Sequence, residues 1–182
     1  MGLAFAENKA KVVFTDIDEK KLDEVMRKLS DQNLDVVGFP CDVTKEEDLK
    51  TTIEQTVKKY GRLDILINNA GLQHVASIEE FPTVKFELMI KVMLVAPFVA
   101  TKHVLPIMKK QNWGRIINIA SSNSLIGFAG KAAYNSEKHG LIGLTKLTAM
   151  EMESYGITVN ALCPGFVVRD FHPIGYTHAR RT

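Results

Sequence analysis

The chain has 182 residues, of which 46% are hydrophobic and 24% are charged, and its formal net charge is +2. This composition is typical of one globular domain, and the nearly balanced charge gives no indication of a nucleic-acid partner or of an anionic membrane surface. Two cysteines far apart, Cys41 and Cys163, and five histidines without metal-ligand spacing predict neither a disulfide framework nor a metal site, and they favour a cytoplasmic location.

Short apolar runs alternate with longer amphipathic segments along the chain. Such runs are typical of buried strands, and apolar residues at a spacing of three and four are typical of helices. In chain order, the sequence predicts the strand 11–16, the helix 18–30, the strand 35–40, the helix 44–61, the strand 63–71, the helix 83–110, the strand 114–122, the helix 132–155 and the strand 157–165. Lys or Pro interrupts each apolar stretch before the ~20 residues of a membrane span, so we expect no membrane partner.

Two of the predicted helices carry local signals. The helix 44–61 opens with Thr44 and Glu47, which have the spacing of a capping box, and it closes at Gly61. The helix 83–110 contains Pro97, which predicts a kink because proline cannot donate the hydrogen bond of its turn.

The order of the elements predicts the fold class. Strands rich in Val, Ile and Leu that alternate with helices indicate an α/β fold, a doubly wound (Rossmann-like) parallel sheet covered on both faces. We expect residues 1–182 to form a single domain, because no repeat or linker is visible. In such sheets, ligands bind beyond the carboxyl ends of the strands. Residues suited to chemistry follow those ends, although Asn, Gly, Ser and Pro also form ordinary turns. They are Asp16, Asp42, NNAG at 68–71, SSN at 121–123 and PG at 164–165.

The segment AAYNSEKHG, at 132–140, places Tyr134 and Lys138 four residues apart. Four residues are about one helical turn, so both side chains leave the same side of a helix. An ammonium group beside a phenol favours the phenolate and lowers the pKa of the phenol from about 10 toward neutrality, where it can accept a proton. The alternative is an ordinary surface pair without chemistry.

Taken together, these motifs resemble the short-chain dehydrogenases/reductases. NNAG at 68–71, Ser121, YNSEK at 134–138 and PG at 164–165 follow one another in the order of that family, and the resemblance runs from about residue 5 to about residue 166. Within the family, LQHVASIEEFP, KVMLVAPFVATKHVLPIMKK and GRIINIASSNSLIGFAGKAAYNSEKHGLIGLTKL are similar to bacterial D-3-hydroxybutyrate dehydrogenases. Residues 167–182 do not resemble the family and form an atypical tail.

The resemblance implies a catalytic set of Ser121, Tyr134 and Lys138 and the cofactor NAD. Tyr134 would accept the hydroxyl proton, Lys138 would stabilise the phenolate and bind the nicotinamide ribose, and Ser121 would orient the substrate oxygen. A carboxylate at Asp16 would bind the adenosine ribose and repel a 2′-phosphate, which favours NAD over NADP. The cofactor-binding residues are then Asp16, Asp42, Asn68, Ala70, Gly71, Tyr134, Lys138, Pro164 and Gly165.

The implied reaction is hydride transfer between NAD and a small 3-hydroxy acid, from 3-hydroxybutyrate to acetoacetate. An amide and a cation suit the carboxylate of such a substrate. The implied substrate-binding residues are Gln73, Ser121, Lys131 and Tyr134. His74 and Asn123 are either further contacts or plain loop residues. Two alternatives remain: another short-chain reductase with a 3-oxoacyl or sugar substrate, and a truncated chain without catalytic activity.

The sequence departs from the family at both ends. The opening strand with its TGxxxGxG loop is absent, and Asp16 follows Gly2 by only 14 positions, whereas about 20 separate the acid from a glycine fingerprint. We therefore expect the chain to begin inside the first helix, to leave a strand edge unpaired, and to end before the family's last helix and strand. Inside the chain, Met93 stands where most of the family has Asn, and its thioether cannot position a water in the same way.

Two long helices, 83–110 and 132–155, are too apolar for one buried stripe each. The residues that cover more than one face are Val92, Val95, Val99, Leu141, Leu144 and Leu147. An apolar surface of this kind predicts a homo-oligomer, a dimer or tetramer formed through these two helices.

Overall fold

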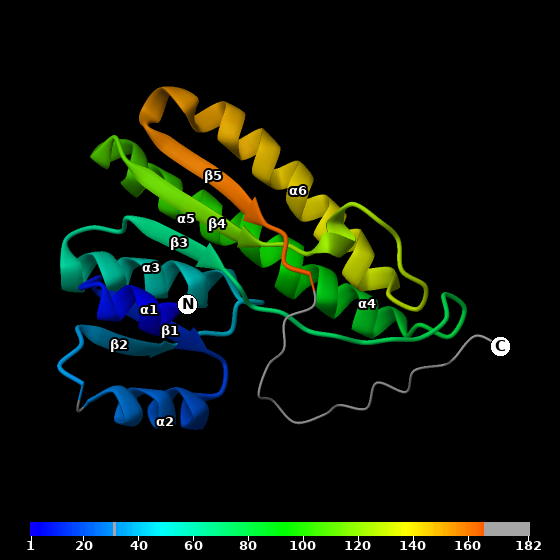
Figure 1. Cartoon of the computed structure of the whole chain (residues 1–182), viewed down its shortest axis with the longest axis horizontal. Helices are drawn as coiled ribbons and strands as arrows, with labels where there is room; N and C mark the ends of the chain where they lie inside the picture. Colours follow the sequence, from blue (N-terminus) through cyan, green and yellow to red (C-terminus); the bar gives the residue numbers. More distant parts are fainter. Residues whose placement is uncertain (31, 166–182) are drawn as a thin grey trace.

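The computed structural model describes residues 1–30 and 32–165, and within them strands and helices alternate as predicted (Figure 1). The first element is a short helix, α1, which precedes the first strand. The elements are α1 Gly2–Glu7, β1 Val12–Asp16, α2 Glu19–Ser30, β2 Val36–Pro40, α3 Glu46–Tyr60, β3 Ile65–Asn68, α4 Thr83–Ile90, η1 Lys91–Val95, α5 Ala96–Gln111, β4 Gly114–Ile119, η2 Ser122–Ser124, α6 Ala132–Met152, η3 Glu153–Tyr155 and β5 Ile157–Leu162. The predicted tail 167–182 lies outside the described residues.

All pairings between the described strands are parallel, which confirms the α/β class. The strands form two hydrogen-bonded groups, β1–β2 and β3–β4–β5. Val12 pairs with Val36, Ile65 pairs with Arg115, and Gly114 pairs with Ile157. The strands run in one direction, so their carboxyl ends lie at the same side of the molecule (Figure 1). Within the described residues no hydrogen bond joins β1 to β3, and this is the unpaired edge that the sequence predicts.

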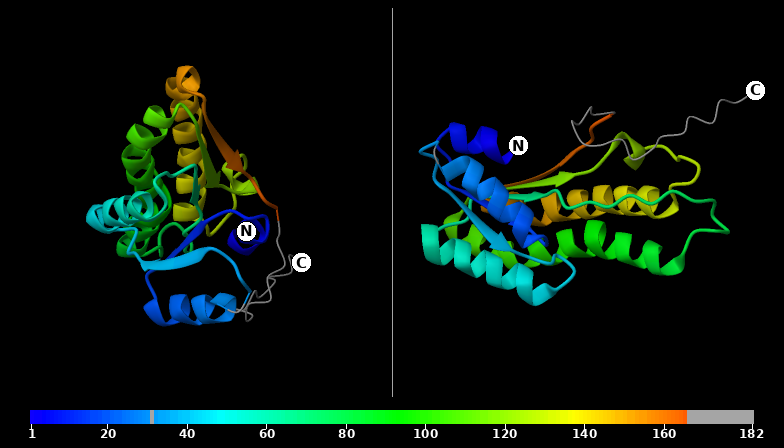
Figure 2. Two further views of the ribbon diagram at one scale, coloured as in Figure 1. Left: turned by 90° about the vertical axis from the view of Figure 1, so that its left-hand side faces the viewer. Right: turned by 90° about the horizontal axis from the view of Figure 1, so that it is seen from below.

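The helices form layers on the strands. Figure 2 shows α5 and α6 on one side of the β3–β4–β5 group and α1 on the other. The main core lies between this group and helices α3, α5 and α6. Its buried residues are Ile53, Leu63, Val104, Met108, Ile116, Met152, Ile157 and Val159. Burial alternates along β5 from the buried Ile157 to the exposed Thr158, as expected for a strand with one packed face in the described chain.

The predicted capping box of α3 is wrong, whereas its predicted end is confirmed. Lys45, not Thr44, is the N-cap residue, and no side chain caps the helix. The Thr44 hydroxyl instead donates to Asp42 Oδ1 at 2.8 Å, because the strand end offers a carboxylate within reach. Gly61 closes the helix in the left-handed conformation, with φ of 76°.

The predicted kink of the long helix takes the form of a π-helical turn, η1, between α4 and α5. Pro97 lies in the first turn of α5 and cannot donate to the carbonyl group four residues earlier, so the turn before it widens. The continuous helical run Thr83–Gln111 has 29 residues and, by length and composition alone, could cross a membrane. Its contacts with α3, α6, β3 and β4 are those of a core helix.

Part of the predicted association surface is buried inside the chain. Val92 and Leu141 are only 8% and 1% exposed, because α6 packs against η1. Gly140 permits this close approach, since a Cβ atom there would lie 2.8 Å from Leu94 Cδ2. Val95 and Leu147 do remain exposed, at 42% and 55%.

Candidate active site

The first part of the candidate site is the turn that follows β4. Ser121 is the N-cap residue of the short helix η2, and its Oγ accepts a hydrogen bond from Asn123 N at 3.2 Å. Ser124 Oγ accepts one from Ser121 N at 3.1 Å, which completes a capping box. The Ser121 hydroxyl oxygen is thereby fixed as an acceptor, and its hydrogen stays available to donate to a ligand.

The Tyr134–Lys138 pair lies at the same strand end. Lys138 Nζ donates to the carbonyl oxygen of Ile119, the last residue of β4, at 2.8 Å. The same Nζ lies 5.4 Å from the centre of the Tyr134 ring. Lys138 is buried and Tyr134 is half-buried. The structure therefore brings Tyr134 and Lys138 to the strand end that Ser121 follows.

A buried carboxylate that was missed in the sequence lies beside this pair. Glu137 is 0% exposed, and its Oε1 lies 3.5 Å from Lys138 Nζ. Burial raises the pKa of Glu137 to about 8, and Lys138 lowers it only in part. Burial also lowers the pKa of Lys138, while Glu137 raises it. The sequence does hold a signal, because Glu137 is four residues from both Ala133 and Leu141 on the buried side of α6.

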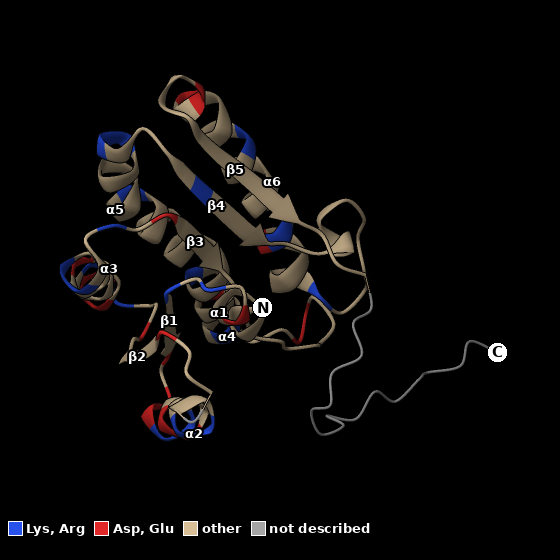
Figure 3. Cartoon of the chain, turned by 60° about the vertical axis from the view of Figure 1, so that its left-hand side comes forward, with Lys and Arg blue, Asp and Glu red and all other residues tan. Residues whose placement is uncertain are grey.

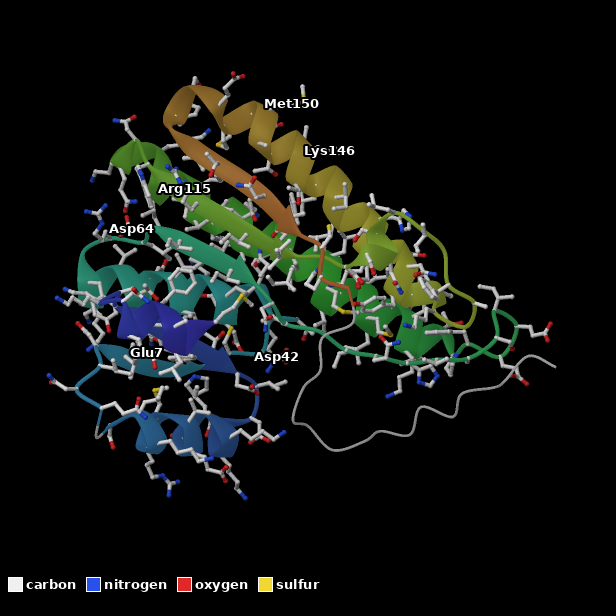
Figure 4. The ribbon with its side chains drawn as sticks, in the orientation of Figure 1. Glu7, Asp42, Asp64, Arg115, Lys146 and Met150 are labelled. Atoms are coloured by element: carbon white, nitrogen blue, oxygen red, sulfur yellow. The ribbon has the colours of Figure 1, made fainter. Side chains whose placement is uncertain are left out.

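The predicted adenosine-binding carboxylates are at the carboxyl ends of two paired strands: Asp16 is the last residue of β1, and Asp42, labelled in Figure 4, follows β2. Cys41 N donates to Asp16 O at 3.0 Å, which ties the two strand ends. Asp16 is exposed, and its Oδ1 accepts from Asp18 N. Asp42 Oδ1 accepts both the hydroxyl and the amide of Thr44, and these bonds hold the pKa of Asp42 below its usual value. A hollow of about 440 Å³ between β1 and α2 adjoins Asp16.

Asn68, the last residue of β3, is joined by hydrogen bonds to β4 and through β4 to α6. Asn68 Nδ2 donates to Asn118 Oδ1 at 2.8 Å, and Asn118 Nδ2 donates to Thr145 Oγ1 at 2.9 Å. This chain of bonds ties β3 to β4 and α6, and Asn118 and Thr145 were not singled out in the sequence. Ala70 and Gly71 are exposed beyond β3.

Met93 supports the backbone that follows NNAG. It is 1% exposed in η1, and its sulfur accepts a hydrogen bond from Leu72 N at 3.3 Å. The same sulfur lies 3.7 Å from the position of a Cβ atom added at Gly71. Met93 therefore holds the loop after β3 in place, by a hydrogen bond from Leu72 N and by packing beside Gly71.

The turn after β5 lies against the turn after β4. Ala120 N donates to Leu162 O at 2.8 Å, and Ser122 N donates to Pro164 O at 2.9 Å. Pro164 is therefore placed beside the residue that follows Ser121, and Gly165 is exposed next to it.

The predicted substrate residues come from two loops that meet. Ala76 N donates to Gly130 O at 3.0 Å, which joins the loop of Gln73 to that of Lys131. Lys131 Nζ lies 5.7 Å from the centre of the Tyr134 ring. Gln73 lines a hollow of about 140 Å³. The other residues that line this hollow are Leu72, His74, Lys85, Leu88 and Met89.

Comparison with known proteins finds similar sequences and a matching family model. The family model described as short chain dehydrogenase matches residues 1–172. An uncharacterized oxidoreductase of Bacillus subtilis is 60% identical over 163 residues, which are 90% of this chain and 63% of the relative. A D-beta-hydroxybutyrate dehydrogenase of Cupriavidus necator is 44% identical over 133 residues, which are 72% of this chain and 52% of the relative. The chain thus spans between half and two thirds of these relatives.

Solved structures share the fold. The structure of ElxO with NADP bound has a TM-score of 0.85 at 36% identity, and the match covers 90% of this chain and 66% of the ElxO chain. An NAD+-bound xylitol dehydrogenase has a TM-score of 0.81 at 32% identity, and the match covers 84% of this chain and 59% of the xylitol dehydrogenase chain. Similar proteins thus include complexes with either nicotinamide cofactor.

Proposed function

Because this chain belongs to the short-chain dehydrogenase family, we propose that it forms the catalytic core of a cytoplasmic, NAD-dependent oxidoreductase that interconverts 3-hydroxybutyrate and acetoacetate. The observation that supports this best is the position of Lys138, which is anchored to Ile119 O and lies against the Tyr134 ring. A buried ammonium held beside a phenol at a strand end is expected of an acid–base pair, not of a surface pair.

In the proposed mechanism, the substrate oxygen lies between Ser121 and Tyr134. The nicotinamide, when bound, supplies the hydride chemistry. The Ser121 hydroxyl donates to the substrate oxygen and orients it, because the oxygen of that hydroxyl already accepts from Asn123 N. The Tyr134 phenolate accepts the hydroxyl proton during oxidation, and Lys138 stabilises the phenolate. In reduction, Tyr134 returns the proton to the oxygen.

The residues present fit part of an NAD site. Asp16 is exposed at a strand end, and among residues 1–30 and 32–165 only its Oδ1 accepts a hydrogen bond, so its other oxygen can accept from a ribose hydroxyl. Gly71 and Gly165 leave backbone exposed beside the same edge. Lys138 would also donate to the nicotinamide ribose. This 182-residue chain carries no TGxxxGxG loop to bind the pyrophosphate, so we expect it to bind NAD weakly.

The substrate assignment depends on Lys131 and Gln73. Lys131, on the loop before α6, has its ammonium group 5.7 Å from the Tyr134 ring, a position from which it could bind the carboxylate of a small hydroxy acid. The 44% identity to a D-beta-hydroxybutyrate dehydrogenase also supports this substrate. A sugar alcohol is the second candidate, because the xylitol dehydrogenase has a similar fold.

The test is an assay of a chimera in which the Bacillus subtilis relative supplies the parts of its length that this chain does not match. We expect reduction of NAD with D-3-hydroxybutyrate, and kcat/KM at least tenfold higher with NAD than with NADP, because Asp16 repels a 2′-phosphate. The Asp16→Ser variant should lose that preference. Turnover with xylitol but not with 3-hydroxybutyrate would contradict the substrate, and an NADP preference would contradict the cofactor.

We also infer that α5 and α6 mediate self-association. Both helices expose large apolar side chains, and Figure 3 shows that charged residues are dense on α2 and α3. Phe98 is 52% exposed on α5, and Met150, labelled in Figure 4, is 78% exposed on α6. Residues of this size and exposure are enriched in interfaces between protein chains.

Sedimentation velocity tests the association. The unmodified chain should sediment as a dimer or tetramer, and a Phe98→Lys, Leu147→Lys double variant should sediment as a monomer, because two buried charges would remain unpaired in the interface. The control is Ile78→Lys, which changes an 80% exposed side chain on a loop. A monomeric unmodified chain, or a double variant that still associates, would contradict this inference.

A further inference from the structure

Glu137 is a buried carboxyl group that the proposed reaction does not use. Its side chain is 0% exposed in α6, between Ala133 and Leu141 on the buried side of that helix. Within the described residues, neither carboxyl oxygen accepts a hydrogen bond, and the charged group beside them is Lys138 Nζ, 3.5 Å from Oε1. A carboxylate without hydrogen bonds is unfavourable in a protein interior, so this group costs stability that an alanine would not.

Glu137 and Tyr134 act on the same ammonium group from different positions. Lys138 Nζ lies 3.5 Å from Glu137 Oε1 and 5.4 Å from the centre of the Tyr134 ring, while its bond to Ile119 O fixes its place. When the carboxyl group is neutral, the full charge of the ammonium favours the Tyr134 phenolate. When it is ionised, it offsets that charge, and the phenol holds its proton more tightly.

We propose that Glu137 is a positioning residue that acts on Tyr134 through Lys138, by setting how much of the ammonium charge the phenol experiences. This inference rests on the proposed function, in which Tyr134 and Lys138 form the acid–base pair. Burial raises the pKa of Glu137 to about 8, so its carboxyl group ionises in the neutral to alkaline range. In that range the negative charge of Glu137 makes the Tyr134 phenol less acidic.

Few other ionisable groups face this pair from the elements packed on α6. Lys138 is the electrostatic partner of Glu137, and Lys138 in turn interacts with Glu137 and with Cys163, which follows β5. Neither η2 nor β5 contains an ionisable side chain. The ionisable residues of α4, η1 and η3 are exposed; they are Lys85, Glu87, Lys91, Glu153 and Tyr155. Outside α6, Lys131 Nζ also lies 5.7 Å from the centre of the Tyr134 ring. A Cys163→Ser variant and a Lys131→Met variant therefore control for these two remaining neighbours.

The test is a titration of the Tyr134 phenol in the full chain without cofactor or substrate. The near-ultraviolet absorbance of tyrosinate is followed against pH, and the curve of a Tyr134→Phe variant is subtracted to isolate Tyr134. In Glu137→Gln, the midpoint should fall by at least about half a pH unit, a threefold change in the acid dissociation constant, because the ammonium charge is no longer offset. Glu151→Gln, which removes an exposed carboxylate from the same helix, should leave the midpoint unchanged.

Two further variants make the result decisive. In a Lys138→Met background, Glu137→Gln should shift the midpoint by less than half as much, because the proposed route runs through the ammonium. Glu137→Ala repeats the test if the buried Gln amide prevents folding, which circular dichroism reports. An unchanged or raised midpoint in the folded Glu137 variants, or an equal shift in the Lys138→Met background, would overturn the proposal. Turnover is not measured here, so a failure of the proposed dehydrogenase function would be seen only in the chimera assay.

Discussion

A Tyr134→Phe variant of the chimera should lose about 10²- to 10⁴-fold in kcat, while its affinity for NAD should change by no more than about twofold. The change removes one oxygen, the one proposed to accept the substrate proton, and it leaves the ring in the contact with Lys138. The bond from Lys138 Nζ to Ile119 O does not involve the phenol and should persist. Turnover is read from the absorbance of reduced nicotinamide, and NAD affinity from calorimetry.

Two matched variants separate the chemistry from general damage. Tyr155→Phe removes the same oxygen from a tyrosine that packs on Lys109 at the far end of α6, and it should leave kcat unchanged. Lys138→Ala should lower both kcat and NAD affinity, because its ammonium serves the phenol and the ribose. Near-normal turnover in Tyr134→Phe would mean that Tyr134 and Lys138 are an ordinary structural pair.

The positions of strands and helices could be predicted because each rests on a local pattern. The five predicted apolar runs, of which VVFTD is the first, match the five parallel strands. The meeting of Tyr134 and Lys138 at the end of β4 could also be predicted, because the pair is one turn apart on a helix that follows that strand.

Features that depend on contacts between distant segments could not be predicted. The sequence from Thr44 to Glu47 has the spacing of a capping box. In the structure, however, the Thr44 hydroxyl donates to the Asp42 carboxylate that follows β2 and does not cap α3. Val92 and Leu141 were expected at the surface, but the close contact between Gly140 and Leu94 buries that side of both helices. Tertiary packing overrides a local signal in both cases.

Side-chain charge inside the core is the hardest property to predict from sequence. In YNSEK, Glu137 looks like any charged helix residue, and its spacing of four residues from Ala133 and Leu141 is the one local sign that it lies on the buried side of α6. The substrate residues have the same difficulty, because Gln73 and Lys131 lie on loops joined by one backbone bond from Ala76 N to Gly130 O. Loop residues carry function, but no periodic pattern fixes where they point.

The free energy of unfolding should fall as the pH rises from about 4.5 to about 8, because Glu137 is buried. An unfolded Glu has a pKa near 4.5, and burial raises that of the folded chain to about 8. Between these values the folded state holds a proton that the unfolded state has released, so raising the pH favours unfolding. The slope reaches about 1.4 kcal/mol for each pH unit. Urea unfolding followed by circular dichroism at several pH values measures it.

The comparison with Glu137→Gln tests the contribution of Glu137 together with its effect on Lys138, because the remaining groups titrate in both proteins. The carboxylates of Asp18 and Asp42 have lowered pKa values and act below the usual 3.8 of Asp, where falling pH destabilises the fold. Burial lowers the pKa of Lys138 from 10.5, which makes stability rise with pH below that value, opposite in sign to the effect of Glu137.

The slope, not the absolute stability, is compared, since a buried Gln amide has a cost of its own. The curve of Glu137→Gln should be flatter than that of the unmodified chain between pH 5 and about 8. Parallel curves would mean that the carboxyl group of Glu137 reaches water, and they would remove the basis for its action on Lys138.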